Sequence, residues 1–228
     1  MDTAWSVYIW IKAHLDHWQT LVAGILALLG AGLTVWLIQR QIKQANDFER
    51  DRHIREERAA RIVLPMALSA IAQYAIDCIK LLEPFVPVAG KGPQVPVGMT
   101  APRIPDGILE PMQASARHAD TAIAEEIGGT VAWLQAQHSR LEGLIRRGAG
   151  RLGKDIWNVE AIGAIMDAAE LHARCGMLFP YSRGSTPDSE LTFQKQLQTA
   201  LFLAGIVDVD HPGLAAAIKT RPAPHTFS

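Results

Sequence analysis

The stretch that decides the fold is WQTLVAGILALLGAGLTVWLIQ, residues 18–39, in which 22 consecutive residues carry no charged side chain. A helix needs about 20 such residues to cross a bilayer core of about 30 Å. Trp18 and Trp36 lie near its two ends, about 27 Å apart along a helix axis, which matches the distance between two membrane interfaces. The stretch therefore predicts a transmembrane helix, with Trp18, Trp36 and Arg40 as its membrane-anchoring residues.

Two other interpretations of residues 18–39 fit less well. A cleaved signal peptide has a basic start and an apolar region of about 7–15 residues. Here Lys12 is the only Lys or Arg in the first 17 residues, and the apolar run continues to Ile38. A buried helix of a soluble protein rarely has so long an uncharged run so near a chain end.

The charges on either side of this segment predict its orientation. Only Lys12 precedes it, whereas seven Lys or Arg residues lie in the 22 residues from Arg40 to Arg61. The positive-inside tendency places residues 1–17 outside as an interfacial tail and the C-terminal part in the cytoplasm, at the cell's inner (plasma) membrane. Cys78 and Cys175 would then both face a reducing compartment, which suits two isolated cysteines.

Small residues recur every three or four positions within the segment, at Ala23, Ala27, Gly30 and Ala31. Small side chains at this spacing allow two membrane helices to approach closely. The pattern predicts helix–helix packing there, so the expected partners of this segment are membrane lipid and a second copy of the chain.

Residues 40–64 alternate positive and negative charges four positions apart, as in Asp51 with Arg55. Such pairs favour a solvated helix, here a charged stalk continuing from the membrane segment. Pro65 predicts a kink or a restart of the helix. Residues 65–83 resemble a second membrane segment, but Ser69, Gln73 and Asp77 form a polar stripe, which favours a core helix of a soluble bundle.

The remaining sequence predicts more helices. Residues 84–111 contain seven of the 13 prolines, which predicts an extended linker or a long surface loop. Residues 112–220 carry helical apolar seams, and residues 221–228 form a tail. No alternating strand pattern occurs. The predicted fold class is all-α: one N-terminal transmembrane helix that continues into a charged stalk helix, then a cytoplasmic helical bundle.

Composition excludes several functions. The balance of 22 Lys and Arg against 23 Asp and Glu argues against a nucleic-acid partner. The motifs GxxxxGK[ST], GxSxG and HExxH are absent from the sequence. We therefore assign no catalytic residue, metal ligand or cofactor, and the sequence favours a role other than catalysis.

Four residues remain as candidates for a site, each with a simpler structural explanation. His118 lies in a loose cluster of His and acidic residues. His138 interrupts an apolar helical seam (Val131, Leu134, Leu141, Ile145), where it could act as a pH switch or simply be a hydrogen-bonded core residue. His172 is three residues from Cys175, a spacing that suits a metal but lacks further ligands. Arg183 lies in a turn that could hold an anion or merely cap a helix.

Three functions are consistent with these patterns. The leading expectation is a single-pass inner-membrane protein whose cytoplasmic helical domain acts as an interaction, scaffold or accessory module for an unknown cytoplasmic protein partner. One alternative is a membrane-tethered enzyme or effector with a site near His118, His172 and Arg183, which must then converge. The other is a small membrane signal transducer.

Overall fold

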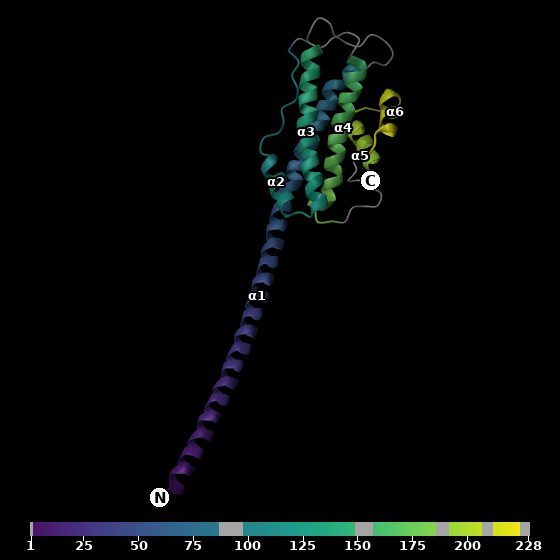
Figure 1. Ribbon diagram of the computed structural model, residues 1–228. Helices are drawn as coiled ribbons and strands as arrows, with labels where there is room; N and C mark the ends of the chain where they lie inside the picture. The colour runs from purple at the N-terminus through teal and green to yellow at the C-terminus, as the bar shows by residue number, and fades with distance from the viewer. Residues whose placement is uncertain (1, 87–97, 149–156, 186–191, 207–211, 224–228) are drawn as a thin grey trace. The chain divides into compact units, whose positions relative to one another are not determined.

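The structure is a computed structural model, and it describes residues 2–86, 98–148, 157–185, 192–206 and 212–223. Six α-helices and one short 3-10 helix follow one another in these ranges, and no strand occurs among them. The α-helices are α1 (Asp2–Leu82), α2 (Leu109–His118), α3 (Thr121–Gly148), α4 (Trp157–Ser182), α5 (Phe193–Leu203) and α6 (Pro212–Thr220), and η1 (Glu83–Phe85) follows α1 directly (Figure 1). The predicted all-α class, with a long apolar N-terminal helix followed by a helical bundle, is confirmed.

The chain divides into two compact units, Met1–Ile54 and Arg55–Ser228, which we call the N-terminal unit and the body. Helix α1 contributes to both of them. Within the body, α3 lies beside α4, α2 packs against α3, and α5 and α6 pack against α4 (Figure 1). The body is thus a helical bundle with α4 in contact with most of its helices.

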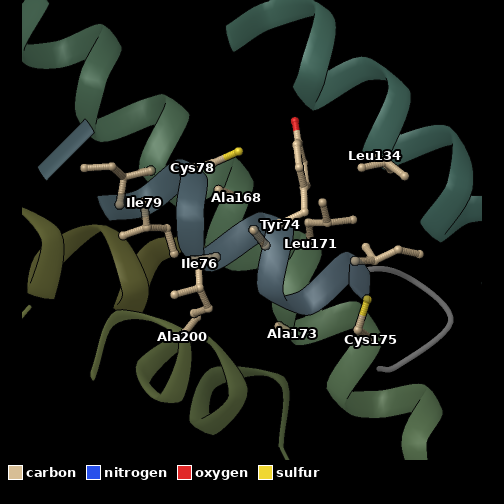
Figure 2. Packing of buried hydrophobic residues seen from close by; sticks show 14 of the residues in the cluster. Tyr74, Ile76, Cys78, Ile79, Leu134, Ala168, Leu171, Ala173, Cys175 and Ala200 are labelled. Atoms are coloured by element: carbon tan, nitrogen blue, oxygen red, sulfur yellow. The ribbon is translucent and has the colours of Figure 1, made fainter. Parts of the chain in front are cut away.

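The C-terminal part of α1 is a core helix of the body. Leu64, Leu68, Ile71 and Leu82 are fully buried in its hydrophobic core. Figure 2 shows Tyr74 and Cys78 of this helix among core residues of α3 and α4. Ser69, Gln73 and Asp77, the predicted polar stripe, are exposed, so segment 65–83 is amphipathic and buries its apolar side within the body.

Pro65 does not end α1, so of the kink or restart that the sequence led us to expect there, the restart is wrong and the kink stays a prediction. The helix assignment continues through this residue from Asp2 to Leu82. A proline inside a helix removes one backbone hydrogen bond and costs about 3 kcal/mol. Leu64 and Leu68 are buried on either side of it, so core packing compensates for the local cost.

Helix ends in the body follow familiar local rules. Arg146 and Arg147 lie in the last turn of α3, where positive charges interact favourably with the C-terminal end of a helix dipole. At the start of α5 the side chain of Thr192 accepts a hydrogen bond from the backbone N–H of Lys195, at 3.3 Å. These ends fix the length of each helix and hence which side chains meet across the bundle.

Candidate functional site

Helix α1 presents a long exposed apolar surface between Leu21 and Ile38. Ten aliphatic side chains there have exposed fractions between 45% and 75%. They are Leu21, Val22, Ile25, Leu26, Leu28, Leu29, Leu33, Val35, Leu37 and Ile38. An 18-residue window of α1 reaches a mean hydropathy of 2.4, and none of that window is buried. This helix is long and apolar enough to cross a membrane.

Two tryptophans lie at the two ends of this segment. Trp18 and Trp36 are both exposed, and the guanidinium of Arg40 lies 5.6 Å from the centre of the Trp36 ring. An Arg over a Trp face gains a cation–π attraction of about 0.5–1 kcal/mol at an exposed position. The same pair gives this end of the segment an amphipathic aromatic ring next to a fixed positive charge, the combination that suits a membrane–water interface.

The small residues of the segment form an open face on α1. Ala23, Ala27, Gly30 and Ala31 are all exposed, and a Cβ added at Gly30 would meet nothing within 4 Å. The hydroxyl of Thr34 donates to the carbonyl of Gly30 at 2.8 Å, so its polar group is satisfied within the helix. The geometry leaves room for a second helix at this face, and self-association there stays a prediction.

His118 ends α2 and lies beside α1. Its Nδ1 is 4.0 Å from a carboxylate oxygen of Glu56, which can form an ion pair only when the imidazole is protonated. One turn earlier, the buried hydroxyl of Ser115 donates to the carbonyl of Ala60 at 3.2 Å. These contacts join α2 to α1, so the described contacts of His118 are those of a residue that helps two helices to pack.

His138 takes part in a polar cluster between α1 and α3. Its Nδ1 is 2.9 Å from the hydroxyl of Tyr74, and its Nε2 is 3.4 Å from the carboxylate of Glu142. The same Tyr74 hydroxyl donates to Oε1 of the buried Gln137 at 3.1 Å. Burial raises the pKa of Tyr74 above its ordinary value, so this phenol remains a neutral hydrogen-bonding group.

Cys78 lies in the same region and is fully buried. Burial raises the pKa of its thiol to about 11, even though hydrogen bonds with Tyr74 and Gln137 act in the opposite direction. A thiol with so high a pKa is almost entirely protonated at neutral pH and is a poor nucleophile. The cluster around His138 therefore suits a hydrogen-bonded core better than nucleophilic chemistry.

His172 lies on α4 and is also buried. Burial lowers its pKa below the ordinary value, while a hydrogen bond with the backbone of Gln196 on α5 partly opposes the change. Its Nδ1 is buried and has no hydrogen-bond partner in the structure. Burial raises the pKa of the nearby Cys175 thiol to about 12. Among the described residues no group of three or more His, Cys, Asp and Glu could hold a metal ion.

Arg183 follows the last turn of α4 and is exposed. Its guanidinium lies 5.2 Å from the centre of the Phe179 ring. Gly184 has a φ of +67°, the left-handed conformation that favours glycine after a helix, and its N–H bonds the carbonyl of Tyr181. Next to this turn, the guanidinium of Arg61 on α1 lies 4.4 Å from the centre of the Tyr181 ring.

The three residues of the predicted enzyme site have different described partners. His118 lies near the carboxylate of Glu56, and His172 forms a hydrogen bond with the backbone of Gln196. The guanidinium of Arg183 lies over the ring of Phe179. His172 and Arg183 are also eleven residues apart on one helical path, about 16 Å along the axis. Catalytic groups have to lie within hydrogen-bond reach of one substrate, so this geometry lends no support to the enzyme alternative.

The structure reveals a charged cluster that sequence reasoning missed, and we call it the Trp133 cluster. Three guanidinium groups, those of Arg140, Arg174 and Arg221, lie 5.1 to 5.7 Å from the centre of the Trp133 ring. The Trp133 indole N–H donates to the carbonyl of Asp167 at 3.0 Å. These residues come from α3, from α4 and from the segment after α6, so the cluster ties three parts of the body together.

Two carboxylates, those of Asp167 and Glu170, pair with the three guanidinium groups of the Trp133 cluster. Asp167 accepts from Arg140 at 3.0 Å and from Arg221 at 2.6 Å. Glu170 accepts from Arg174 and from Arg221, each at 2.8 Å. Charge-assisted hydrogen bonds of this length are among the stronger ones in proteins. Because the positive charges are already paired, the cluster suits a structural role more than the capture of an anionic ligand.

One acidic residue next to this cluster is poorly satisfied. Glu126 on α3 is 5% exposed, and its Oε2 is buried with no hydrogen-bond partner in the structure. Burial raises the pKa of this carboxyl, and the charge of Arg174 only partly opposes the change. Glu126 therefore destabilises the folded body when it is ionised.

A sequence signal for the Trp133 cluster does exist. Asp167, Glu170 and Arg174 are the only ionisable residues of Ile165–Phe179 other than His172 and Cys175, in an otherwise apolar stretch. Charges within such a stretch require partners, because an unpaired buried charge is costly. The identity of Arg221 as a partner depends on tertiary structure and cannot be read from spacing.

Two features thus stand out, an exposed apolar helix in the N-terminal unit and a bundle whose internal polar groups are mostly paired with one another. Neither one carries the geometry of a known reaction centre. Comparison with protein-family models, with curated proteins and with solved structures finds no match to this chain.

Proposed function

We propose that the protein is a single-pass inner-membrane protein that crosses the bilayer once through residues 18–39 of α1. The single observation that supports this most is the exposure of the whole apolar window, with mean hydropathy 2.4 and no part buried. A core helix of a soluble protein would bury such a window. In water, ten half-exposed aliphatic side chains forfeit on the order of 10 kcal/mol of burial free energy, which a bilayer core would recover.

The proposed orientation places the body in the cytoplasm and the first 17 residues outside. The support is the excess of Lys and Arg from Arg40 to Arg61 over the single Lys12 before the span. Under this proposal Trp18 lies at the outer interface, and Trp36 with Arg40 lies at the inner one.

The proposed role of the body is that of an anchored interaction or accessory module for a cytoplasmic protein. The support is that the polar groups of the described body serve mainly to join its own helices, as in the Trp133 cluster. A helical bundle that is anchored at a membrane can hold a partner protein at that membrane without any catalytic site of its own. No partner of known identity is implied by this proposal.

Membrane fractionation tests the first part of the proposal. The full chain, tagged at both ends, is expected to stay with the membranes after an alkaline carbonate wash. Leu29→Arg near the middle of the span is expected to release much of it, because an Arg there costs about 2.5–3.5 kcal/mol of insertion free energy. Gln41→Arg, beyond the span, is the matched control and should leave the chain in the membrane fraction.

The same samples separate the competing interpretations. A signal sequence would remove the N-terminal tag from the body, and a soluble protein would leave the membrane fraction in the carbonate wash. For orientation, a Cys introduced at Thr3 should react with an impermeant maleimide added outside, and one at Arg183 should not. The reverse pattern would overturn the orientation.

Crosslinking in intact membranes, followed by mass spectrometry, tests the module role. We expect one cytoplasmic protein to recur among the crosslinked species and to disappear when Leu68→Asp unfolds the core of the body. Recovery of no protein other than this chain would contradict a role in holding a cytoplasmic partner.

A further inference from the structure

The first two basic residues after the apolar segment of α1 share one face of the helix with Trp36. Trp36, Arg40 and Lys43 follow one another at steps of four and three residues, so they lie on one side of α1. All three are exposed, and the guanidinium of Arg40 lies 5.6 Å from the centre of the Trp36 ring. We call these three residues the basic stripe.

The positive charges of the basic stripe are not neutralised by other described residues of the chain. Asp47 is the first acidic residue after the apolar segment, four residues beyond Lys43. Among the residues that the structure describes, no ion pair joins Asp47 or any other carboxylate to Arg40 or Lys43. Farther along α1, by contrast, Arg61 forms an ion pair with Glu57. The two cations of the basic stripe are therefore open to a ligand.

The positive excess of α1 after the apolar segment is confined to the basic stripe. Residues 36–46 read WLIQRQIKQAN, with two basic side chains, four amides and no acidic side chain. Residues 47–61 contain five acidic and five basic side chains, which balance one another. The net charge of +2 between residues 36 and 61 thus comes from Arg40 and Lys43.

We infer that the basic stripe binds the headgroup of an anionic phospholipid, in the leaflet on the C-terminal side of the span. The inference rests on the proposed membrane anchoring, which places Trp36 at a membrane–water interface. Arg40 then lies about 6 Å and Lys43 about 10 Å beyond Trp36 along the helix axis. The headgroup layer on each side of a bilayer core is about 5–8 Å thick. The two cations therefore lie within this layer and at its outer edge, where lipid phosphates are in reach.

Charge selects an anionic lipid over a zwitterionic one. Phosphatidylcholine carries a quaternary ammonium beside its phosphate, so its headgroup has no net charge for the basic stripe to attract. Phosphatidylglycerol has the negative phosphate without that ammonium, and guanidinium and ammonium groups donate strong hydrogen bonds to phosphate oxygens. Each Lys or Arg near an anionic surface strengthens binding about fivefold, and the effect falls off within about 8–10 Å.

A lipid titration of the full chain in a neutral detergent tests the inference, with native mass spectrometry as the readout. Phosphatidylglycerol is expected to bind about 30-fold more tightly than phosphatidylcholine with the same acyl chains, because two cations act together. Arg40→Gln combined with Lys43→Gln is expected to reduce this preference to less than about threefold. Both positions are exposed, so these substitutions should not unfold the chain.

Arg50→Gln combined with Arg52→Gln is the matched control, because it removes the same charge from the same helix. These two residues lie about 15 and 18 Å beyond Arg40, outside the range of the attraction, so the preference should remain about 30-fold. Equal binding of the two lipids by the unaltered chain would overturn the inference. So would a preference that survives the loss of Arg40 and Lys43, or one that the control pair abolishes.

The fractionation experiment keeps the two proposals distinguishable. If the chain stays in the membrane after the carbonate wash but shows no preference for phosphatidylglycerol, the headgroup contact is wrong and membrane anchoring stands. If the chain leaves the membrane fraction but still selects phosphatidylglycerol through Arg40 and Lys43, the anchoring proposal fails and the headgroup contact stands.

Discussion

Arg221 connects the segment after α6 to α4, and its replacement by alanine is the sharpest test of the Trp133 cluster. The guanidinium bonds Asp167 at 2.6 Å and Glu170 at 2.8 Å and lies 5.7 Å from the Trp133 ring centre. Arg221→Ala removes all of these contacts at once and leaves the other residues of the cluster in place.

The expected loss of stability follows from burial and from the remaining partners. The side chains of Arg221, Asp167 and Glu170 are 24%, 15% and 7% exposed, so their charge-assisted bonds are only partly screened. Such bonds contribute about 1.5–3 kcal/mol. Neither carboxylate is left unpaired, because Arg140 and Arg174 remain. We therefore expect a loss of about 2 kcal/mol, or about a 30-fold larger opening equilibrium constant.

The buried cysteines of the body provide the assay. Cys78 and Cys175 are both fully buried, so a thiol reagent reaches them only when the body opens. The labelling rate of the full chain in membranes or detergent reports the opening equilibrium when opening and closing are fast. Arg221→Ala is expected to label about 30-fold faster than the unaltered chain.

Lys219→Ala is the matched control, because Lys219 is basic and exposed and lies in the last turn of α6, two residues before Arg221. It should change the labelling rate less than about threefold, as surface substitutions usually do. A rate for Arg221→Ala within threefold of the unaltered chain would refute the reasoning. The double variant with Asp167→Asn should be less destabilised than the sum of the two single variants, because both remove the same bond.

Three further variants probe single groups in the body. Burial lowers the pKa of His172 in the folded chain, so below about pH 6.5 the unfolded chain binds more protons than the folded one. The stability of the body should therefore fall as the pH drops below that value, and His172→Gln should flatten this part of the Tm-against-pH curve. Burial raises the pKa of Glu126, so Glu126→Gln should stabilise the body at pH 7 and slow thiol labelling, whereas the exposed Glu125→Gln should not. Tyr74→Phe leaves the buried Gln137 oxygen without its donor and should cost about 1–2 kcal/mol, measured by the labelling rate of Cys175. Unchanged Tm profiles or rates in these variants would contradict the respective contacts.

The parts of the fold that sequence could predict depend on local pattern. The apolar window of α1 is continuous in sequence, so its length and hydropathy are visible without a structure. The end of α3 at Gly148 follows from two arginines and a glycine in one turn. Pro65 shows the limit, because its local preference is overridden by the burial of Leu64 and Leu68 against distant helices.

The candidate residues show the same limit. Sequence located His138 on an apolar seam but could not identify Tyr74, which lies 64 residues away, as its partner. Arg221 was expected in a C-terminal tail, yet its carboxylate partners are more than 50 residues earlier in the chain. Tertiary packing determines which residues make such contacts. A role in binding another molecule is even harder to predict from the spacing of residues in the sequence.

The boundary between the two units falls inside α1, after Ile54, where the helix assignment is uninterrupted. A protease needs an extended segment, so it has to unwind several helical turns before it can separate the apolar segment from the bundle. A gene fusion that replaced all of α1 would remove Leu64, Leu68 and Ile71 from the core. A fusion that is to keep the core of the body therefore has to join the two chains within α1, before Leu64.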